Sequence, residues 1–447
     1  MRRRVTDAQQ YVPLHHQHHG AHRHKRGTKT LAKWSLAWMT PALMGLAGAH
    51  AADTAQRANW VNSWQGSPTK GATFDTQTCP SDVGAQDQTV RNIVYLSTGG
   101  DRIRVRISNA GGATPLRVGA ASVAPASGDG PGLDGDAHVL HFSGAAEVVV
   151  PAGGEALSDV VDLPVKSFDA LAVSVYLPAH TGPATQHFLA TQTSYLSAGN
   201  QTGSGNTLAF TRPVSCWMFV SGVDVDAAPT VKGTLVAFGD SITDGYQSTA
   251  GKNRRFPDAL ARRMSLRQGA TLSVSNAGIS GNELLTKRDQ AMFGVPASER
   301  LARDVLTQPG LRAVVFLEGI NDIGDKSARA GDVIQAMQQV IAQVHAAGVR
   351  IYGGTLLPFM GSNGTYHADY GTPAGERERL KVNEWIRNSH AFDGVIDFDK
   401  VTRDPTNPGQ MRAVFDSGDH LHPSDAGYEA MARAVNLDVI VSDLGRH

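Results

Sequence analysis

Four short segments in the second half of this 447-residue chain carry groups that together can perform acyl transfer. Ser241 offers a hydroxyl nucleophile, while His422 and Asp419 offer a base and a carboxylate that can orient it. The backbone N–H groups of Ser241 and Gly281 and the side-chain amide of Asn321 are donors suited to an oxyanion. Each residue alone is typical of an ordinary turn or helix cap. The ordered set, however, contains every group that a seryl-ester intermediate requires.

The choice of base and carboxylate has alternatives nearby. His420 could act as the base in place of His422. We favour His422 because it follows Asp419 by three residues and directly precedes Pro423, which restrains its backbone. Asp416 is the alternative carboxylate. The two histidines have no third ligand at a recognisable spacing, so we expect no metal at this site and no cofactor in the reaction.

Strands and helices that alternate after residue 230 must position these segments. The hydrophobic pattern predicts strands at 234–238, 272–276, 313–317, 349–356 and 395–398, and helices at about 257–266, 298–306, 332–347 and 376–388. A last helix follows Ser424, which is a suitable N-cap. Such alternation predicts an α/β fold with a parallel sheet covered on both faces. Ser241, Gly281 and Asn321 each follow a predicted strand, so they should meet at one edge of the sheet.

Residues 230–447 resemble the SGNH, or GDSL, hydrolase superfamily. The resemblance rests on Gly239-Asp240-Ser241-Ile242 at the nucleophile, on Gly281 and Asn321 in the two oxyanion segments, and on the Asp-x-x-His pair near the C-terminus. It implies a flavodoxin-like, three-layer domain. The catalytic residues would be Ser241, Asp419 and His422, and the oxyanion hole would be formed by Ser241, Gly281 and Asn321. The preceding sequence, including 60–64 and 102–109, resembles that of secreted bacterial and fungal members with an N-terminal β-domain.

The first half of the chain has the pattern of an all-β domain. Between about residues 57 and 226, apolar or alternating segments at 92–96, 102–107, 148–150 and 171–176 are separated by Gly, Pro, Asp and Ser. This spacing predicts a β-sandwich of jelly-roll type. Trp60, Trp64 and Trp217 could form a platform for a sugar, or they could belong to the core.

The first 51 residues predict a basic leader and a signal peptide. Lys29 and Lys33 precede an uncharged stretch at 34–49, and Ala49-His50-Ala51 has the small-x-small form of a cleavage site. We therefore expect maturation near Ala52 and a secreted or periplasmic protein without an integral membrane segment. With a hinge at 227–229, the expected organisation is a leader and signal peptide at 1–51, a β-sandwich domain at 52–228 and the hydrolase domain at 229–447.

Charge and cysteine content indicate which partners and which cellular compartment to expect. Residues 1–33 hold eight Lys or Arg and one acidic residue, which leaves 33 basic and 40 acidic residues in the rest of the chain. A mature protein with this negative balance is a poor candidate for nucleic-acid binding. In an exported chain Cys79 and Cys216 could form a disulfide, and two separate buried thiols are the alternative.

The expected function is that of an exported, metal-independent serine esterase that hydrolyses carboxylic esters through an acyl-serine. Its substrate would be a small-molecule or polymer-linked ester. Short-chain acyl esters, including acetyl groups on polysaccharides, compete with the lipid esters of a lipase or lysophospholipase, and the β-domain could bind polysaccharide. Acyl transfer to an acceptor other than water, or a non-catalytic carbohydrate-binding protein on a hydrolase scaffold, are the alternatives. The segment 358–375 could border the pocket or form a plain surface loop.

Overall fold

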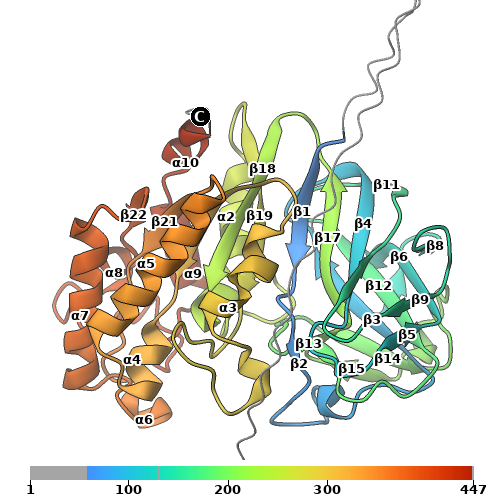
Figure 1. Ribbon diagram of the computed structural model, residues 1–447, viewed down its shortest axis with the longest axis horizontal. Helices are drawn as coiled ribbons and strands as arrows, with labels where there is room; N and C mark the ends of the chain where they lie inside the picture. The colour runs from blue at the N-terminus through green and yellow to red at the C-terminus, as the bar shows by residue number, and fades with distance from the viewer. Residues whose placement is uncertain (1–57, 129, 445–447) are drawn as a thin grey trace, which may run out of the picture. The chain divides into compact units, whose positions relative to one another are not determined.

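The computed structural model describes residues 58–128 and 130–444 of the chain (Figure 1). The described residues form one compact unit. Within it we distinguish the β-region, residues 60–226, from the α/β region, residues 231–443. The predicted leader, signal peptide and cleavage site lie outside the described residues. Among the helices of the described residues, none has the length and apolar character needed to cross a membrane.

A parallel sheet forms the centre of the α/β region. Its strands are β18 (Val231–Gly239), β19 (Thr271–Gly278), β20 (Leu311–Leu317), β21 (Arg350–Gly354) and β22 (Gly394–Ile396). They lie in the order β19-β18-β20-β21-β22, which is the strand order of a doubly wound sheet of the flavodoxin type. The strands are apolar runs because both faces of the sheet are covered, and Leu235, Val314 and Ile351 are fully buried. The five predicted strands are therefore present, with ends that differ by a few residues.

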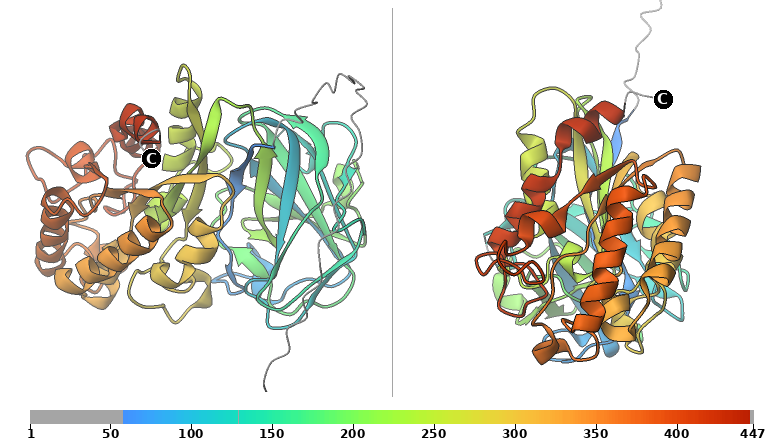
Figure 2. Two further views of the ribbon diagram at one scale, coloured as in Figure 1. Left: turned by 45° about the horizontal axis from the view of Figure 1, so that its top comes forward. Right: turned by 90° about the vertical axis from the view of Figure 1, so that its left-hand side faces the viewer.

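Helices cover both faces of this sheet (Figure 2). They are α1 (Ser241–Asp244), α2 (Phe256–Ser265), α3 (Ala297–Leu301) with a π-helical turn after it (Ala302–Leu306), α4 (Ile320–Lys326), α5 (Ala330–Ala346), α6 (Asn363–Tyr366), α7 (Pro373–Asn388), α8 (Phe398–Thr402), α9 (Asp425–Ala434) and α10 (Leu437–Asp443). Helix α5 contacts α3 and α7, whereas α2 contacts α9. The α5 helix buries Met337, Val340 and Val344, whose spacing puts them on one face. Ser424 caps α9 by accepting the N–H of Gly427, as the sequence predicts.

Antiparallel sheets form the β-region. The strands are β1 (Trp60–Gln65), β2 (Thr69–Lys70), β3 (Gln88–Tyr95), β4 (Gly100–Ser108), β5 (Leu116–Val118), β6 (Ala120–Ser127), β7 (Gly132–Leu133), β8 (His138–Val139), β9 (Val148–Val150), β10 (Glu155–Leu157), β11 (Val161–Val165), β12 (Ala170–Leu177), β13 (Thr185–His187), β14 (Ser194–Ala198), β15 (Arg212–Val214), β16 (Trp217–Met218) and β17 (Val220–Asp226). Two large sheets have the orders β1-β17-β4-β10 and β15-β14-β3-β12-β6-β7. Two small ones have the orders β16-β13-β2 and β5-β9. Both large sheets contribute to one core, for example through Val105 and Val173.

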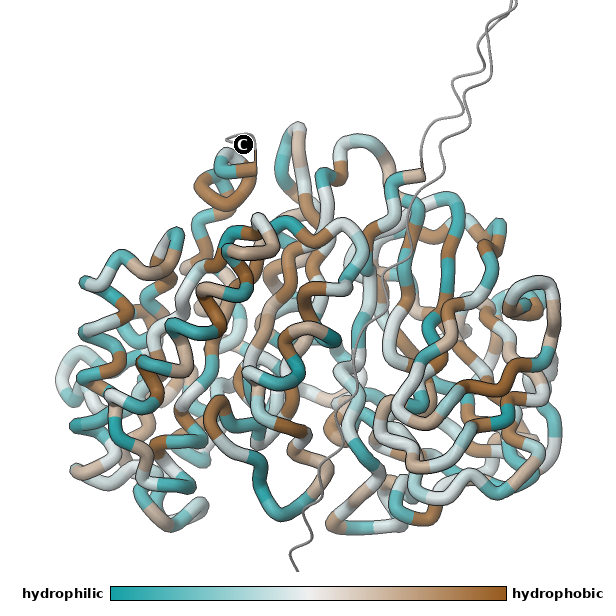
Figure 3. Tube along the Cα trace, in the orientation of Figure 1, coloured by the Kyte–Doolittle hydropathy of each residue, from teal (hydrophilic) through white to brown (hydrophobic). Residues whose placement is uncertain are grey.

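The hydropathy of the chain follows this arrangement. Figure 3 shows hydrophobic residues concentrated along the strands of the parallel sheet. In the β-region, strand β4 alternates, with Ile103, Val105 and Ile107 fully buried. A run of apolar residues is thus buried on two sides, whereas an alternating strand has one side toward the core.

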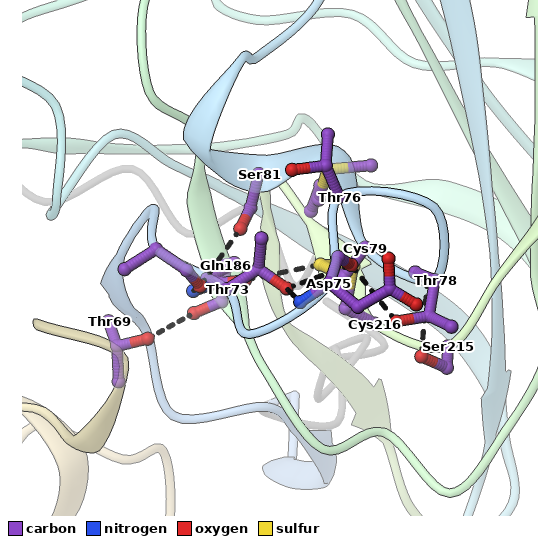
Figure 4. Close-up of a disulfide and its surroundings, with 12 residues drawn as sticks. Thr69, Thr73, Asp75, Thr76, Thr78, Cys79, Ser81, Gln186, Ser215 and Cys216 are labelled. Carbon is purple, nitrogen blue, oxygen red and sulfur yellow. Dashed lines mark hydrogen bonds between the residues drawn. A yellow bond between two sulfur atoms is a disulfide. The ribbon is translucent and has the colours of Figure 1, made fainter. Parts of the chain in front are cut away.

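A disulfide joins Cys79 and Cys216 within the β-region (Figure 4). Their Cα atoms are 5.8 Å apart, and the two residues are 137 positions apart in the sequence. The structure thus has the bridge and not two separate thiols. Next to Cys216, Trp217 packs edge to face on Trp64 with ring centroids 5.0 Å apart, and both side chains are buried. These two tryptophans belong to the core and do not form a sugar platform.

Buried polar groups join the β-region to the α/β region. The Asn62 backbone N–H donates to Thr234 Oγ1 (3.1 Å), and its side-chain Oδ1 accepts from Ser275 Oγ (2.7 Å). The predicted hinge at 227–229 is also tied down, because the Asn59 amide donates to the carbonyl groups of residues 227, 228 and 231. Polar groups buried in this way must keep their partners, so the contact between the two regions is specific.

Candidate active site

Ser241 lies in the first turn after β18, at the carboxyl edge of the parallel sheet. It is the first residue of α1, and Asp240 caps this helix by accepting the N–H of Ile242 (2.9 Å). At this position the Ser241 N–H has no acceptor within its own helix, so it can donate to a ligand. The Ser241 side chain is buried, and its Oγ lies 2.8 Å from Nε2 of His422. The structure therefore brings the predicted nucleophile and base together.

Asp419 extends this contact into a hydrogen-bonded series. Its Oδ2 lies 2.8 Å from Nδ1 of His422. Its Oδ1 accepts the backbone N–H groups of Leu421 (2.9 Å) and His422 (2.8 Å). Because a carboxylate only accepts, Nδ1 of His422 carries the proton, and Nε2 is left as the acceptor for the Ser241 hydroxyl. This is the tautomer that a general base requires.

The surroundings of Asp419 keep its carboxyl ionised. Burial alone raises its pKa, but the hydrogen bond and charge of His422 and the two backbone N–H groups lower it more. The net effect holds the pKa of Asp419 well below its usual value. Tyr366 also donates its hydroxyl to Asp419 Oδ2 (2.9 Å). An ionised carboxylate here can stabilise the imidazolium that forms when His422 accepts a proton.

The alternative base and carboxylate form a separate pair. Nδ1 of His420 lies 2.6 Å from Oδ2 of Asp416, and the His420 side chain is 51% exposed. The Ser241 hydroxyl contacts His422 instead. Within residues 58–128 and 130–444, no cluster of His, Cys, Asp or Glu side chains has the arrangement of a metal site.

Gly281 lies in the loop after β19 and has a φ of 76°, a conformation that favours glycine. A Cβ at this position would lie 2.4 Å from a ring carbon of Phe293. The Phe293 ring therefore packs directly on the backbone of the predicted oxyanion segment, and this contact excludes any side chain. The preceding Ser280 donates its N–H (2.9 Å) and hydroxyl (2.6 Å) to Asp244 Oδ2, which fixes the loop.

Asn321 follows β20 in the first turn of α4. Its Nδ2 donates to the carbonyl oxygen of Asn282 (2.8 Å), and its Oδ1 accepts from the Tyr370 hydroxyl (2.6 Å). These two contacts orient the amide and leave one Nδ2 hydrogen for a ligand. Asn321 lines the same cavity as Ser241 and Gly281. The structure thus gathers the three predicted oxyanion donors at one place.

Two buried carboxyl groups beside these residues shape the local backbone. Asp322 accepts the N–H groups of Leu284 (2.9 Å) and Leu285 (2.8 Å), and so holds the loop that contains Gly281. Burial, with the negative charge of Asp322 nearby, raises the pKa of Asp240 to about 7. Asp240 keeps its hydrogen bond from α1 in either protonation state, because one oxygen accepts in both.

Three tyrosines that surround the site were not singled out from the sequence. The hydroxyl groups of Tyr366 and Tyr370 donate to the carboxylate and the amide described above. The ring of Tyr246 packs edge to face on the imidazole of His422, with centroids 4.7 Å apart. The segment 358–375 therefore borders the pocket and is not a plain surface loop. Tyrosines in a loop rich in Gly and Ser were the available signal, but a loop has no periodicity to show which ones face the site.

A cavity of about 360 Å³ opens beside the nucleophile. Most of its lining side chains are aromatic or aliphatic, and the polar groups belong mainly to the residues described above. The lining residues are Phe74, Phe188, Leu189, Ser241, Tyr246, Ser280, Gly281, Arg288, Phe293, Asn321, Tyr366, Tyr370, Leu421 and His422. A concave, largely apolar cavity with a few convergent polar groups is suited to a small ester.

The site has a hydroxyl, an imidazole and a carboxylate in series. Oxyanion donors lie beside them at the ends of parallel strands, and this combination defines a serine hydrolase site. Residues 237–430 match the GDSL-like Lipase/Acylhydrolase family. This part of the chain therefore belongs to the SGNH/GDSL hydrolase superfamily, and the protein is a carboxylic ester hydrolase. The resemblance of residues 230–447 to this superfamily is confirmed.

Several solved structures are similar to about half of the chain. A carbohydrate acetylesterase family member from Sinorhizobium meliloti is 20% identical with a TM-score of 0.38, over 47% of this chain and 99% of that one. The lipase/acylhydrolase from Enterococcus faecalis is 23% identical with a TM-score of 0.36, over 48% and 96%. The native aryl esterase of M. smegmatis is 16% identical with a TM-score of 0.36, over 45% and 95%. No match was found among curated protein sequences.

Proposed function

We propose that the protein is an exported serine esterase in which Ser241, His422 and Asp419 act as the catalytic triad. The observation that carries this proposal is the series of hydrogen bonds from Ser241 Oγ through His422 to Asp419, 2.8 Å at each step. His422 Nε2 accepts the hydroxyl proton as Oγ attacks the ester carbonyl. The N–H groups of Ser241 and Gly281 and the amide of Asn321 stabilise the charge that develops on the carbonyl oxygen.

The second half of the reaction uses the same groups. The alcohol leaves with the proton from His422, and an acyl-serine remains. Water then attacks the acyl carbonyl while the neutral imidazole accepts a proton, and the acid leaves as the Ser241 hydroxyl is restored. These steps need no metal or cofactor, so we expect chelators to leave the rate unchanged.

For substrates we propose esters with short acyl groups, including acetyl groups on carbohydrates, and we propose that the β-region can bind the polymer. Lipid esters are the second candidate, which the aromatic lining of the cavity favours. Acetylated glycans and phospholipids should be screened side by side, with released acetate and fatty acid measured. A non-catalytic carbohydrate-binding protein is less well supported, because such a protein has no need for this hydrogen-bonded series.

Export is supported by the Cys79–Cys216 disulfide, since such bonds persist mainly in oxidising compartments. We expect the mature protein in the periplasm or the medium, with an N-terminus near Ala52. Cell fractionation followed by N-terminal sequencing tests this proposal. An unprocessed chain that stays in the cytoplasm would contradict it.

The esterase proposal is tested with Ser241→Ala on p-nitrophenyl acetate, butyrate and longer esters. Loss of the nucleophile should lower kcat by at least about 10⁴-fold. The matched control is Ser265→Ala, which removes an exposed hydroxyl in α2 and should keep the wild-type rate. Equal rates for wild type and Ser241→Ala would overturn the proposal. Product analysis with added alcohols then shows whether the acyl group also passes to acceptors other than water.

A further inference from the structure

Three apolar side chains of the β-region, Phe74, Phe188 and Leu189, line the cavity that contains the proposed nucleophile. The Phe74 ring lies 5.8 Å from that of Phe188 and 5.9 Å from that of Phe293 in the α/β region, between ring centroids. We call the side chains of Phe74, Phe188, Leu189 and Phe293 the apolar wall. Because Phe293 packs on the backbone of Gly281, the wall extends from the oxyanion segment to the β-region.

The side chains of the apolar wall are partly exposed to solvent, although apolar side chains are usually buried. Phe74 is 69% exposed although it contacts two rings, and Phe188, Leu189 and Phe293 are half-buried. The charged Arg288 at this cavity already donates to a glutamate and to a tyrosine hydroxyl. Large aromatic side chains left exposed beside a reactive group are typical of a binding surface. An apolar group of a substrate would cover them.

The loop that carries Phe74 is held on both sides of that residue. On one side, Gln186 Nε2 of β13 donates to the carbonyl oxygen of Ala72 (2.7 Å). On the other side, the disulfide attaches Cys79 to Cys216, which directly precedes β16 (Figure 4). The Phe74 ring is therefore exposed on a loop whose backbone is tied to β13 and β16.

Buried contacts also link Phe188 to the oxyanion segment. Phe188 directly follows His187, whose Nε2 lies 2.9 Å from Oδ1 of Asp244. The other oxygen of Asp244 accepts the N–H and hydroxyl of Ser280, the residue before Gly281. This chain of contacts sets the position of Phe188 relative to the place where the ester carbonyl would lie.

We propose that the β-region forms the specificity pocket of the enzyme, and that the apolar wall binds an apolar group attached to the scissile ester. Among the candidate substrates named above, the wall favours esters whose acyl chain or alcohol is aliphatic beyond two carbons, or aromatic, over acetyl groups on carbohydrates. This inference rests on the proposed function, because it names what the same site selects. Each methylene buried against the wall should raise kcat/KM about fourfold until the cavity is filled.

Two ester series separate the acyl side from the alcohol side. In the first, p-nitrophenyl acetate, butyrate, hexanoate and octanoate vary the acyl chain. In the second, methyl, butyl and phenyl acetate vary the alcohol. A rise of kcat/KM in one series identifies the part of the ester that lies against the wall. Equal kcat/KM throughout both series, or a preference for acetylated glycan over every apolar ester, would overturn the inference.

Variants of the apolar wall test its residues directly. Phe74→Ala should lower the ratio of kcat/KM for the best apolar ester to that for acetate by at least about threefold, and Phe74→Ala/Phe188→Ala by about tenfold or more. The matched control is Leu208→Ala, which removes an 84% exposed apolar side chain elsewhere in the β-region and should leave the ratio unchanged. Phe74 is exposed, so its variant should fold even where the double variant does not. A wild-type ratio in folded Phe74→Ala would contradict the inference.

A binding measurement separates failure of the wall from failure of the proposed function. Calorimetry with Ser241→Ala and both ester series should show that, in one series, the ester with the largest apolar group binds more tightly than the smallest ester. Adding Phe74→Ala to this variant should remove the difference. If the wild type hydrolyses esters with equal kcat/KM throughout both series, the wall is wrong and the esterase stands. If it hydrolyses none but binding depends on the apolar group and on Phe74, the esterase is wrong and the wall stands.

Discussion

The β-region and the α/β region contribute to one cavity in different ways. The α/β region supplies the hydroxyl, the imidazole, the carboxylate and the amide donors, all just beyond the ends of its strands or in the loop before α9. The β-region supplies Phe74, Phe188 and Leu189. The groups suited to reaction thus lie on a fold that gathers loops at one edge, whereas three of the four side chains of the apolar wall lie on the neighbouring fold and Phe293 is the fourth. The chemistry and the choice of substrate can therefore change separately.

The two regions are nevertheless not independent. Burial lowers the pKa of His187, but the charge and hydrogen bond of Asp244 raise it more, so its net pKa lies above the usual value. Its Nδ1 lies 3.1 Å from the Ser67 carbonyl oxygen and its Nε2 lies 2.9 Å from Oδ1 of Asp244, in α1, the helix that begins with Ser241. Because a carbonyl oxygen and a carboxylate only accept, both ring nitrogens are placed to donate, as in a histidine cation paired with a carboxylate. Removing one partner of such a pair leaves a buried charge without compensation, which makes the pair costly to break. The two regions thus have different roles but pack into a single unit.

Removing the disulfide of the β-region should greatly lower the stability of the protein and leave its chemistry intact. Cys79→Ser/Cys216→Ser opens a bridge between residues 137 apart in the sequence. The free energy of unfolding should fall by about 5 kcal/mol, because the unfolded chain regains the freedom that the bridge removes. Chemical denaturation followed by circular dichroism measures this change. At a temperature where the variant is folded, its kcat on p-nitrophenyl acetate should remain close to the wild-type value.

Reduction of the wild type provides the control for this variant. Dithiothreitol should lower the stability of the wild type by a similar amount and leave the double variant unaffected. A folded variant that has lost acetate turnover would show that the β-region contributes to the chemistry itself. A folded variant that keeps acetate turnover but loses preference for longer esters would show that the β-region acts in selection, since the bridge holds the loop of Phe74.

Removing an oxyanion donor from the α/β region should lower kcat without lowering the stability of the protein. Asn321→Ala removes one proposed oxyanion donor and should lower kcat by about 10²- to 10³-fold, or about 2.7–4 kcal/mol. Steady-state kinetics on one ester measures it. Asn388→Ala, at the exposed end of α7, is the control and should behave as the wild type. An unchanged kcat in Asn321→Ala would remove this residue from the oxyanion hole.

Much of the α/β region could be predicted from the sequence for physical reasons. Its strands are apolar runs because both faces are covered, and parallel strands end at one edge, so Ser241, Gly281 and Asn321 could be expected to meet. Asp419 and His422 are three residues apart and pair through a local turn. The preference for this pair over His420 and Asp416 also depended on local spacing.

The apolar wall could not be predicted in this way. Phe74 and Phe188 are brought together by the pairing of β2 with β13, which joins residues more than one hundred positions apart. An exposed phenylalanine in an irregular loop has no periodic pattern that marks it for a site. The contact of Phe293 with Gly281 could not be predicted either. A phenylalanine that packs on the backbone of a glycine looks the same in the sequence as any other phenylalanine. Long-range pairing in the β-region therefore limited the prediction.

Tyr366 contributes both a ring to the cavity lining and a hydroxyl to Asp419, and a single substitution separates the two contributions. Tyr366→Phe keeps the ring that lines the cavity and removes the hydroxyl that donates to Asp419. Loss of a hydrogen bond to a charged group should lower kcat about tenfold, or about 1.4 kcal/mol, through poorer orientation of His422. The preference among ester chain lengths should not change, because the apolar surface stays. Kinetics on acetate and hexanoate measure both quantities. A shift in chain-length preference would mean that the Tyr366 hydroxyl also contributes to selection, so that a group in contact with the triad and the apolar wall would share this role.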